Sequence, residues 1–451
     1  MDPLLSRKIQ TKLLRWFEKN GRDLPWRKTR DPYAIWISEI MLQQTQVAMV
    51  IPYYQRFLKS FPTVHHLAKS DLSKVLKIWE GLGYYSRARN LHRASKIILN
   101  HCKGKIPDHL KDLLNLPGIG KYTAGAILSI AYNKEAPILD GNVRRVLSRL
   151  FAVSNKNTSN SLSLRGVKRL RGKAEANPEI PRSARNKLRN PNKDEIATPF
   201  GLAMTCKNDE YAYIRKPARD NSEHFLWHLS ESLIPKGFAS SFNQAIMDLG
   251  AMICTPKDPL CHRCPLHHYC KAKTSGNPER YPSRVVKKRI PHIEAISGVI
   301  LNNGKTLLNQ RPPKGLLGGL WEFPNWRNEE SGRLRLRLRD HIKKEMGMNV
   351  EVKESFGTFK QTFTHFKLTL HVFNCEAIDG RGKGKWVAVR NLHLLPMSRV
   401  HRRIAEAIQL SRMSLRGAIA VARRSRSKPG DSSRRSEQAP QSREIASLRS
   451  Q

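Results

Sequence analysis

Acidic residues are scarce in this sequence: 37 Asp and Glu stand against 81 Lys and Arg over 451 residues, for a formal net charge of +44. So large an excess indicates a polyanionic partner, although charge alone does not separate nucleic acid from an anionic membrane surface. No eighteen consecutive residues are apolar, which excludes an ordinary membrane-spanning helix. The amino-terminal segment lacks the combination of a basic start, an apolar core and a small-residue cleavage site, so we expect a reducing compartment.

Part of the basic excess lies in two polar segments with weak hydrophobic periodicity. Residues 156–220 hold fifteen basic and seven acidic side chains, and residues 413–451 hold nine basic and three acidic ones. We predict that 155–222 is a disordered insertion and that 412–451 is a disordered basic tail. Such segments raise nonspecific affinity for phosphate without selecting a site.

Cysteine is sparse, with seven in the chain, yet four of them lie within the seventeen residues 254–270. This density is what thiolate ligation of one metal centre requires, and either zinc or a [4Fe-4S] cluster can be held by four cysteines. Zinc sites usually pair two Cys-x-x-Cys units, whereas only one such unit is present and the other gaps are six and five residues. The spacing modestly favours a cluster and leaves zinc open. The four residues are Cys254, Cys261, Cys264 and Cys270.

Hydrophobic periodicity divides the remaining chain into two regions. From Leu4 to about Leu150 apolar residues recur at helical spacing, and the pattern resumes after the polar stretch and continues into the cysteine segment. We therefore predict a helical domain over 1–280. After a basic linker at 281–291, short β-type runs with two helical stretches predict a separate α+β domain at 292–411.

Two short motifs in the helical region point to DNA and to acid chemistry. Residues 112–132 contain Leu116-Pro117-Gly118-Ile119-Gly120, which has the form of a helix-hairpin-helix turn. Gly118 and Gly120 let backbone N–H groups approach a phosphate at a helix N-terminus, although an isolated Gly-x-Gly is as typical of an ordinary turn. Asp140, about twenty residues later, would by itself be a helix N-cap. The combination with the cysteines is more specific than either motif.

These motifs, with three sequence blocks, resemble the helix-hairpin-helix DNA glycosylase superfamily and specifically the MutY-type adenine DNA glycosylases. The resemblance covers about residues 4–154 and 223–410. It implies a mainly α fold, with a two-lobed helix-hairpin-helix core, one [4Fe-4S] cluster on the four cysteines rather than zinc, and a Nudix-like α+β carboxy-terminal domain. The blocks are Trp36–Val47, Phe242–Ala245 and Asp248–Met252.

The resemblance implies hydrolysis of the N-glycosidic bond of adenine, which needs an acid for the leaving base and an anion for the cationic sugar. Glu39 matches the general acid, and its apolar neighbours would raise a carboxyl pKa by desolvation; a solvated helix-face glutamate is the ordinary alternative. Asp140 matches the anion and is expected to stay ionised near a helix N-terminus. Tyr122 and Asn142 are expected to assist. Endonuclease III-type relatives carry a lysine where Tyr122 stands, so we expect a monofunctional glycosylase.

The resemblance also assigns contacts with DNA and with the extruded base. A flipped base leaves a gap in the duplex that side chains must fill, and the glycines at 81 and 83 are expected to present a leucine there. The residues that match positions beside the lesion are Gln44, Thr45, Leu82 and Tyr84. The residues that match the adenine pocket are Trp26, Arg27 and Gln244.

The carboxy-terminal domain lacks the acidic Nudix box. Its nearest helical stretch, 333–346, is basic and offers too few carboxylates to hold magnesium, so pyrophosphohydrolase activity is not expected. In the family this domain recognises 8-oxoguanine opposite the adenine. Here Phe363 is expected to stack or wedge, and Thr364 and His365 to hydrogen-bond the oxidised base; a plain β-strand is the alternative.

Three functions stay open on the sequence. The first is an adenine DNA glycosylase of base excision repair that acts, as a monomer and away from membranes, on double-stranded DNA with A:8-oxoguanine or A:G mispairs. Its expected location is the bacterial cytoplasm at the nucleoid, or the nucleus or mitochondrion in a eukaryote. The second is an endonuclease III-like pyrimidine glycosylase, which Tyr122 and the extra domain disfavour. The third is a noncatalytic iron-sulfur DNA-binding protein, which the insertion favours.

Overall fold

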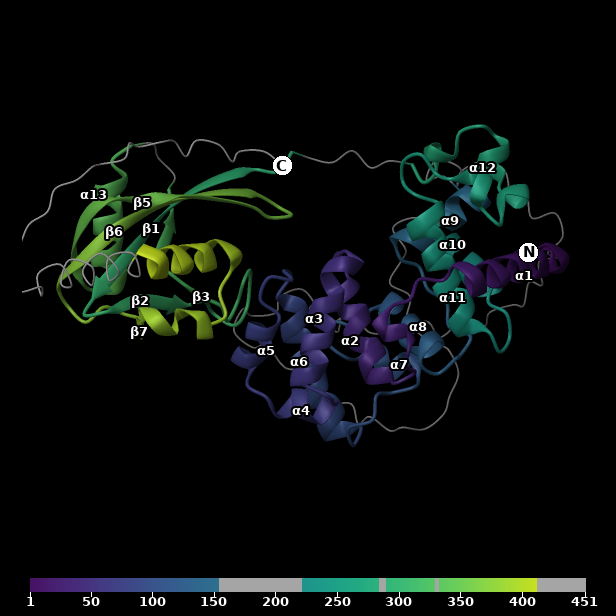
Figure 1. Cartoon of the computed structure of the whole chain (residues 1–451), viewed down its shortest axis with the longest axis horizontal. Helices are drawn as coiled ribbons and strands as arrows, with labels where there is room; N and C mark the ends of the chain where they lie inside the picture. Colours follow the sequence, from purple (N-terminus) through teal and green to yellow (C-terminus); the bar gives the residue numbers. More distant parts are fainter. Residues whose placement is uncertain (154–220, 284–288, 329–331, 412–451) are drawn as a thin grey trace, which may run out of the picture.

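The computed structural model describes residues 1–153, 221–283, 289–328 and 332–411, which form a helical part and a sheet part (Figure 1). The predicted tail at 412–451 and residues 284–288 of the predicted linker lie outside the described residues. So does the predicted insertion, except that Asn221 and Ser222 begin helix α10. The domain boundaries stay predictions. No helix in the described ranges is both long and apolar enough to cross a membrane.

The first lobe of the helical part surrounds α2 (Pro32–Leu42). Asp31 caps this helix by accepting from the backbone N–H groups of Tyr33 and Ala34, and every residue from Tyr33 to Met41 is buried. A helix that is apolar on all sides belongs inside a core. The other helices of this region are α3 (Val47–Ser60), α4 (Val64–Lys69), α5 (Leu72–Ile78), α6 (Ser86–His101), α7 (Leu110–Leu114) and α8 (Lys121–Ile130).

The second lobe has its own core and carries the cysteine segment. Helix α8 contributes Ile127 to the first core and Ala126 to the second, and α2 likewise contributes Trp36 to one and Ile35 to the other. Side chains on these two helices therefore lie at the boundary between the lobes. The elements of the second lobe are α1 (Pro3–Asn20), α9 (Gly141–Leu150), α10 (Asn221–Ser232), α11 (Ala239–Asp248), the π-helix η3 (Leu249–Ile253) and α12 (Lys271–Thr274).

The sheet part is a mixed sheet with helices against both faces. Strand order is β3-β2-β1-β6-β5, with β1 parallel to β6, while β4 pairs with β1 and β7 with β2. Helix α13 (Leu334–His341) and the π-helix η7 (Ile342–Met346) pack on one face, and the helix over 399–411 packs on the other. The strands are β1 (His292–Asn302), β2 (Lys305–Gln310), β3 (Trp321–Glu322), β4 (Asn325–Arg327), β5 (Asn349–Thr362), β6 (Lys367–Asp379) and β7 (Lys385–Ala388).

The sheet part docks on the first helical lobe. Leu320, 1% exposed, belongs to the first helical core although it precedes β3 in the sheet part. Arg89 of α6 donates to the carbonyl oxygens of Gly318 at 2.9 Å and Gly315 at 3.1 Å. The Tyr85 hydroxyl donates to the carbonyl oxygen of Met397 at 3.1 Å. These contacts fix the position of the sheet relative to the helices.

One shielded ion pair reinforces this docking. Arg402, on the helix over 399–411, donates to Glu80 Oε1 at 2.6 Å and Oε2 at 3.2 Å, and its side chain also donates to the carbonyl oxygens of Leu392 and Leu395. The two side chains are only 16% and 13% exposed. Glu80 also pairs with Lys77, so the carboxylate lies between two cations and Arg402 is the one that comes from the sheet part.

We predict that Arg402→Ala weakens the docking of the sheet part by about 2 kcal/mol, because it removes the shielded ion pair with Glu80 and leaves two backbone carbonyls without their donor, although Glu80 keeps Lys77 as a partner. The measurement is urea unfolding of the whole chain, followed by limited proteolysis of the region between the two parts. Arg403→Ala is the matched control, since Arg403 is exposed and donates to the Lys360 carbonyl oxygen at 3.3 Å, within the sheet part. Equal effects of the two substitutions would contradict the prediction.

Candidate active site

A cavity of about 500 Å³ lies at the boundary between the two helical lobes. It is lined from α2, from the start of α8, from the turn before α9 and from α11. The volume is within the range of small-ligand sites and is sufficient for one nucleobase. The predicted site residues that line it are Glu39, Asp140, Tyr122, Asn142, Trp26, Arg27, Gln244, Gln44 and Thr45.

Glu39 lies in this cavity as a buried carboxyl, 3% exposed. Its Oε2 accepts a hydrogen bond of 2.7 Å from the Tyr122 hydroxyl, which also approaches Met247 Sδ at 3.5 Å. Burial raises the pKa of Glu39 to about 7; the Tyr122 hydrogen bond and the Arg27 charge act against this rise, and the Asp140 charge adds to it. The same burial raises the pKa of Tyr122, so its hydroxyl stays a neutral donor. Glu39 is therefore protonated below about neutral pH.

Asp140 is the N-cap of α9, and its carboxylate is fixed by two hydrogen bonds. Its Oδ1 accepts from the Val143 backbone N–H at 2.7 Å, and its Oδ2 accepts from Asn142 Nδ2 at 3.1 Å. Burial nevertheless raises the pKa of Asp140 above its usual range, while the hydrogen bonds from Val143 and Asn142 act to lower it. The net direction is opposite to that expected from a helix N-terminus alone, because the desolvation of this half-buried group outweighs the helix contribution.

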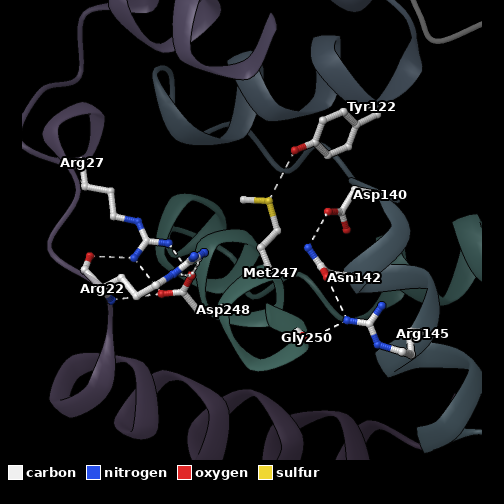
Figure 2. A network of polar contacts seen from close by, with 9 residues as sticks. All are labelled: Arg22, Arg27, Tyr122, Asp140, Asn142, Arg145, Met247, Asp248 and Gly250. Atoms are coloured by element: carbon white, nitrogen blue, oxygen red, sulfur yellow. Dashed lines mark hydrogen bonds and ion pairs between the residues drawn. The ribbon is translucent and has the colours of Figure 1, made fainter. Parts of the chain in front are cut away.

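Arg145, one turn further along α9, connects this carboxylate to the cysteine segment (Figure 2). Its Nη2 donates to Asn142 Oδ1 at 2.8 Å and to the Gly250 carbonyl oxygen at 2.6 Å, and its Nε donates to the Cys254 carbonyl oxygen at 2.6 Å. Gly250 lies so close to Asn142 that a Cβ added there would be 2.7 Å from the Asn142 Cβ. The orientation of Asn142, and with it of Asp140, is thus set by the loop that carries the cysteines.

Two arginines at the opposite wall converge on one buried carboxylate (Figure 2). The Asp248 side chain is fully buried and accepts from Arg22 Nη2 at 2.6 Å and from Arg27 Nη1 at 2.7 Å. The hydrogen bonds and charges of these arginines hold the pKa of Asp248 below its usual range against the effect of burial. Asp248 thereby fixes Arg27 at the cavity wall and offsets its positive charge near Glu39.

Leu82 and Tyr84, two of the four residues predicted to lie beside the lesion, are outside this cavity, at the turn between α5 and α6, here called the wedge turn (residues 81–84). Gly81 and Gly83 have φ of +99° and +77°, as expected for a tight turn. Leu82, however, is 6% exposed and packs in the first core, so the turn does not present it in this structure, and its contact with DNA stays a prediction. Arg87 holds the turn inward by donating to the Leu82 and Gly83 carbonyl oxygens. Tyr84 is the exposed member of the turn, at 42%.

The helix-hairpin-helix turn has the conformation that its glycines predict. It joins α7 to α8, with Gly118 at φ +84° and Gly120 as the N-cap of α8. A Cβ on Gly118 would lie 2.8 Å from the Asn90 Cβ, so a side chain is excluded there for packing reasons as well. The start of α8 at Lys121 is a helix N-terminus of the kind that binds phosphate.

The predicted recognition residues form the tip of the hairpin between β5 and β6. Phe363 N–H donates to the Phe366 carbonyl oxygen at 2.8 Å, and the two rings stack with centroids 4.6 Å apart. Thr364 and His365 are exposed in this turn, so they are not part of a regular strand. The Thr364 hydroxyl is 2.7 Å from the Tyr84 hydroxyl. The hairpin tip therefore meets the wedge turn of the helical part.

The four cysteines are half-buried free thiols, and three of them pack against the second core. Burial raises the pKa of Cys264 to about 12 and raises those of Cys261 and Cys270, and the neighbouring thiols add to each rise. Such thiols ionise only beside a compensating positive charge. Among the described residues no three His, Cys, Asp or Glu side chains are close enough together to hold a metal ion as they stand, so it is the sulfur chemistry of the four side chains that fits a soft metal centre. Arg149, whose Nη1 is 3.4 Å from Cys254 Sγ, supplies a further cation.

Sequence reasoning missed three buried charged residues that position the site. Asp248 was part of a quoted block, but nothing in the sequence shows that Arg22 and Arg27 are its partners. Arg145 follows Asn142 by three residues, a helical spacing that predicts that the two side chains lie on one face of α9. Nothing in the sequence indicates that Arg87 has a structural role, although it is 8% exposed and donates to carbonyl oxygens at the end of α2.

Comparison with known proteins matches three parts of the chain to families. Residues 37–171 match the HhH-GPD superfamily of base excision DNA repair proteins. Residues 254–270 match the iron-sulfur binding domain of endonuclease III, so the thiol centre is an iron-sulfur site. Residues 296–407 match the NUDIX domain. The mainly helical core with an α+β Nudix-like domain, predicted from the sequence, is confirmed.

Several curated relatives match most of the chain. The adenine DNA glycosylase of Buchnera aphidicola from Acyrthosiphon pisum is 33% identical over 80% of this chain and 84% of its own length. That of Buchnera aphidicola from Schizaphis graminum is 31% identical over 87% of this chain and 96% of its own length. The human adenine DNA glycosylase is 29% identical over 88% of this chain and 73% of its own length.

We predict that Glu39→Gln stabilises the fold at alkaline pH. A carboxyl whose pKa is raised by folding binds its proton more tightly when folded, so stability falls as pH rises from the ordinary carboxyl range through about 7. At pH 8 the cost is about 3 kcal/mol, which the neutral amide avoids; at pH 4.5 the two proteins should be alike. Urea unfolding at both pH values is the measurement.

The control for this experiment is Glu135→Gln, which changes an exposed glutamate of the helical part. It should change stability little at either pH, because an exposed carboxyl is not desolvated by folding. If Glu39→Gln has the same effect at pH 8 as at pH 4.5, Glu39 is not a neutral acid in the folded protein.

Proposed function

Because the chain belongs to the adenine DNA glycosylase family, we propose that it acts in base excision repair by hydrolysing the N-glycosidic bond of adenine mispaired with 8-oxoguanine or guanine. The observation that carries this proposal is the pairing, in one base-sized cavity, of a neutral acid at Glu39 with a second carboxyl at Asp140. The same proposal includes binding of the protein, as a monomer, to double-stranded DNA. The net charge of +44 would attract the DNA phosphates.

Glu39 is the proposed general acid. Adenine is a poor leaving group as an anion and a better one when a ring nitrogen is protonated. A carboxyl that keeps its proton near neutral pH therefore lowers the barrier to C–N cleavage. The Tyr122 hydroxyl holds Glu39 Oε2 at 2.7 Å and leaves the other oxygen to face the base. A donor of this kind typically contributes about 10²–10⁴ to the rate.

Asp140 is proposed to stabilise the sugar as it acquires positive charge. Anchoring by the Val143 N–H and by Asn142 keeps one carboxylate in a fixed orientation, so no reorganisation is needed when the charge develops. Two carboxyls with different environments thus divide the acid and anion roles. Tyr122 cannot form a Schiff base as a lysine would, which supports a glycosylase without strand cleavage.

The side chains that line the inter-lobe cavity are suited to bind a purine base. Trp26 and Gln244 line it together with Arg27, whose guanidinium is held by Asp248. Gln244 Nε2 donates to the Ser240 carbonyl oxygen at 3.3 Å, which leaves its side-chain carbonyl oxygen to accept from an exocyclic amine. This arrangement supports adenine as the base that is extruded.

The hairpin tip of the sheet part supports recognition of the opposite base. Thr364 and His365 are exposed there, and the sheet is docked so that Thr364 meets Tyr84 of the wedge turn. The side chains that hydrogen-bond the 8-oxoguanine and those that fill the gap left by the flipped base would then lie next to each other. Phe363 stacks on Phe366, which keeps the tip rigid.

The iron-sulfur centre is proposed to be one [4Fe-4S] cluster on Cys254, Cys261, Cys264 and Cys270. When bound, such a cluster supplies a fixed, thiolate-bound charge centre that orders the loop. Arg145 and Arg149 transmit that order, since Arg145 holds the Cys254 carbonyl oxygen and Arg149 those of Thr255 and Pro256.

We predict that Glu39→Gln lowers the single-turnover rate of adenine release by about 10²–10⁴ while DNA affinity changes little, because it removes the proton donor and keeps the shape. The measurement is alkali-revealed strand scission of duplexes with A opposite 8-oxoguanine, beside thymine-glycol duplexes. Glu135→Gln is the control. Normal turnover of the Glu39 variant, or cleavage of thymine glycol alone, would refute the assignment.

We predict that Thr364→Ala with His365→Ala lowers the preference for 8-oxoguanine over guanine roughly thirtyfold, because two lost hydrogen bonds at about 1 kcal/mol each total about 2 kcal/mol. The intrinsic rate on bound adenine should change little. Affinities and single-turnover rates on A:8-oxoguanine and A:G duplexes give both values.

The matched control for that pair is Thr358→Ala with His371→Ala. These residues form a Thr–His contact of 3.4 Å across the same two strands, away from the hairpin tip. Tyr84→Phe separates the Tyr84 contact from base recognition, because it removes the hydroxyl and keeps the ring. Unchanged discrimination in the tip variant, or equal loss in the control, would remove the tip from the site.

A further inference from the structure

Met247, on α11, brings a thioether sulfur to the wall of the inter-lobe cavity. Its side chain lines this cavity of about 500 Å³ and is half-buried rather than enclosed in a core. The Met247 Sδ lies 3.5 Å from the Tyr122 hydroxyl, and the two atoms point toward each other (Figure 2). Methionine commonly fills irregular gaps in a core, but this one borders a space that is large enough for a nucleobase and therefore for hydrogen peroxide.

The other methionines of the described ranges differ from Met247 in burial or in position. Met1 and Met49 are exposed, at 45% and 50%, but neither lines the cavity. Met252, in η3, is half-buried and does not line it either. The remaining four are at most 3% exposed, namely Met41, Met346, Met348 and Met397. Met247 is therefore the described methionine that an oxidant in the cavity would meet.

The Tyr122 hydroxyl has a single proton, and its two neighbours are unequal acceptors. Glu39 Oε2 lies 2.7 Å away and is a strong acceptor, whereas a thioether sulfur is a weak one. The proton therefore points to Glu39 in the reduced protein. With Oε2 accepting, the proton of a neutral Glu39 is on its other oxygen, which is the proposed donor to the base.

Oxidation by a peroxide would reverse the order of these acceptors. One oxygen of hydrogen peroxide is transferred to Met247 Sδ: the O–O bond breaks, an S–O bond forms, the sulfur loses two electrons, and the second oxygen leaves as water with both protons. The sulfoxide oxygen is a strong acceptor on an atom that lies 3.5 Å from the Tyr122 hydroxyl. Once Tyr122 donates to the sulfoxide, its oxygen can only accept from Glu39, so the acid proton moves to Oε2 and away from the base.

We propose that Met247 is a modification site at which a peroxide inactivates the general acid, by forming a sulfoxide that takes the Tyr122 proton from Glu39. The inference rests on the proposed function, since the acid that is inactivated is the one assigned there to adenine release. The modification is reversible, because methionine sulfoxide is reduced by dedicated reductases.

The test is peroxide treatment of the full chain, with its iron-sulfur centre loaded, beside Met247→Leu and Met49→Leu. Met49→Leu is the matched control, since it removes an exposed methionine of α3 that does not line the cavity. Peptide mass spectrometry gives the sulfoxide fraction at each methionine, and visible absorbance identifies the doses at which the iron-sulfur centre stays intact. At those doses, duplex affinity and single-turnover adenine release are measured against each protein's own untreated sample.

In the unsubstituted protein and in Met49→Leu, the fraction of enzyme that releases adenine at the untreated rate should fall in proportion to the Met247 sulfoxide. The oxidised fraction should react about 10²-fold more slowly or worse, because a general acid contributes about 10²–10⁴ to the rate. Met247→Leu should keep its own untreated rate after the same treatment. Duplex affinity should change little, and a methionine sulfoxide reductase should restore the rate of the unsubstituted protein.

The inference is overturned if Met247 stays reduced at doses that oxidise Met49, if its sulfoxide form releases adenine at the untreated rate, or if Met247→Leu is inactivated equally. A loss of duplex affinity that accounts for the lost activity also overturns it, because oxidation would then block the cavity and not the acid. Absence of adenine release from the untreated protein would instead refute the proposed function, and the mass measurement would still decide whether Met247 is modified.

Discussion

A carboxyl group kept out of water between two helical lobes imposes most of the arrangement around it. Glu39 is on a helix whose inner residues are all buried, so its environment is set by packing that belongs to both cores. A protonated acid in that place requires a neutral donor beside it and a limited positive charge nearby. Tyr122 provides the first, and Asp248 provides the second by offsetting Arg27. The lobes could not shift relative to each other without changing the charge state of this acid.

Three buried or half-buried arginines fix the position of elements around this carboxyl group. Arg145, Arg149 and Arg87 each donate to several backbone carbonyl oxygens and so fix the ends of elements rather than single side chains. Through them the iron-sulfur loop, the N-cap of α9 and the turn at 81–83 become parts of one framework. Rigid surroundings of this kind give a site whose dipoles need no rearrangement during the reaction.

The sequence supports the fold and most of the inter-lobe site because its signals are local. Asp31-Pro32 starts α2, Gly118 shapes the hairpin turn, and the apolar neighbours of Glu39 indicate its burial. Contacts between distant segments leave no such signal. The direction of Leu82 depends on Arg87, and β3 and β4 are too short to show alternation. The pairing of Asp248 with Arg22 spans 226 positions and could not be read from spacing.

The hydroxyl pair where the hairpin tip meets the wedge turn has a chemical consequence. Each hydroxyl has one proton to give, so within the Tyr84–Thr364 contact one oxygen is the donor and the other the acceptor. When Thr364 gives its proton to the phenol, its remaining lone pair can only accept. Oxidation at C8 converts N7 of guanine from an acceptor into a donor, so a threonine oxygen in that state would complement the lesion and be electrostatically mismatched to the undamaged base. Under the recognition proposed above, the direction of the Tyr84–Thr364 hydrogen bond would therefore decide which of the two purines Thr364 complements.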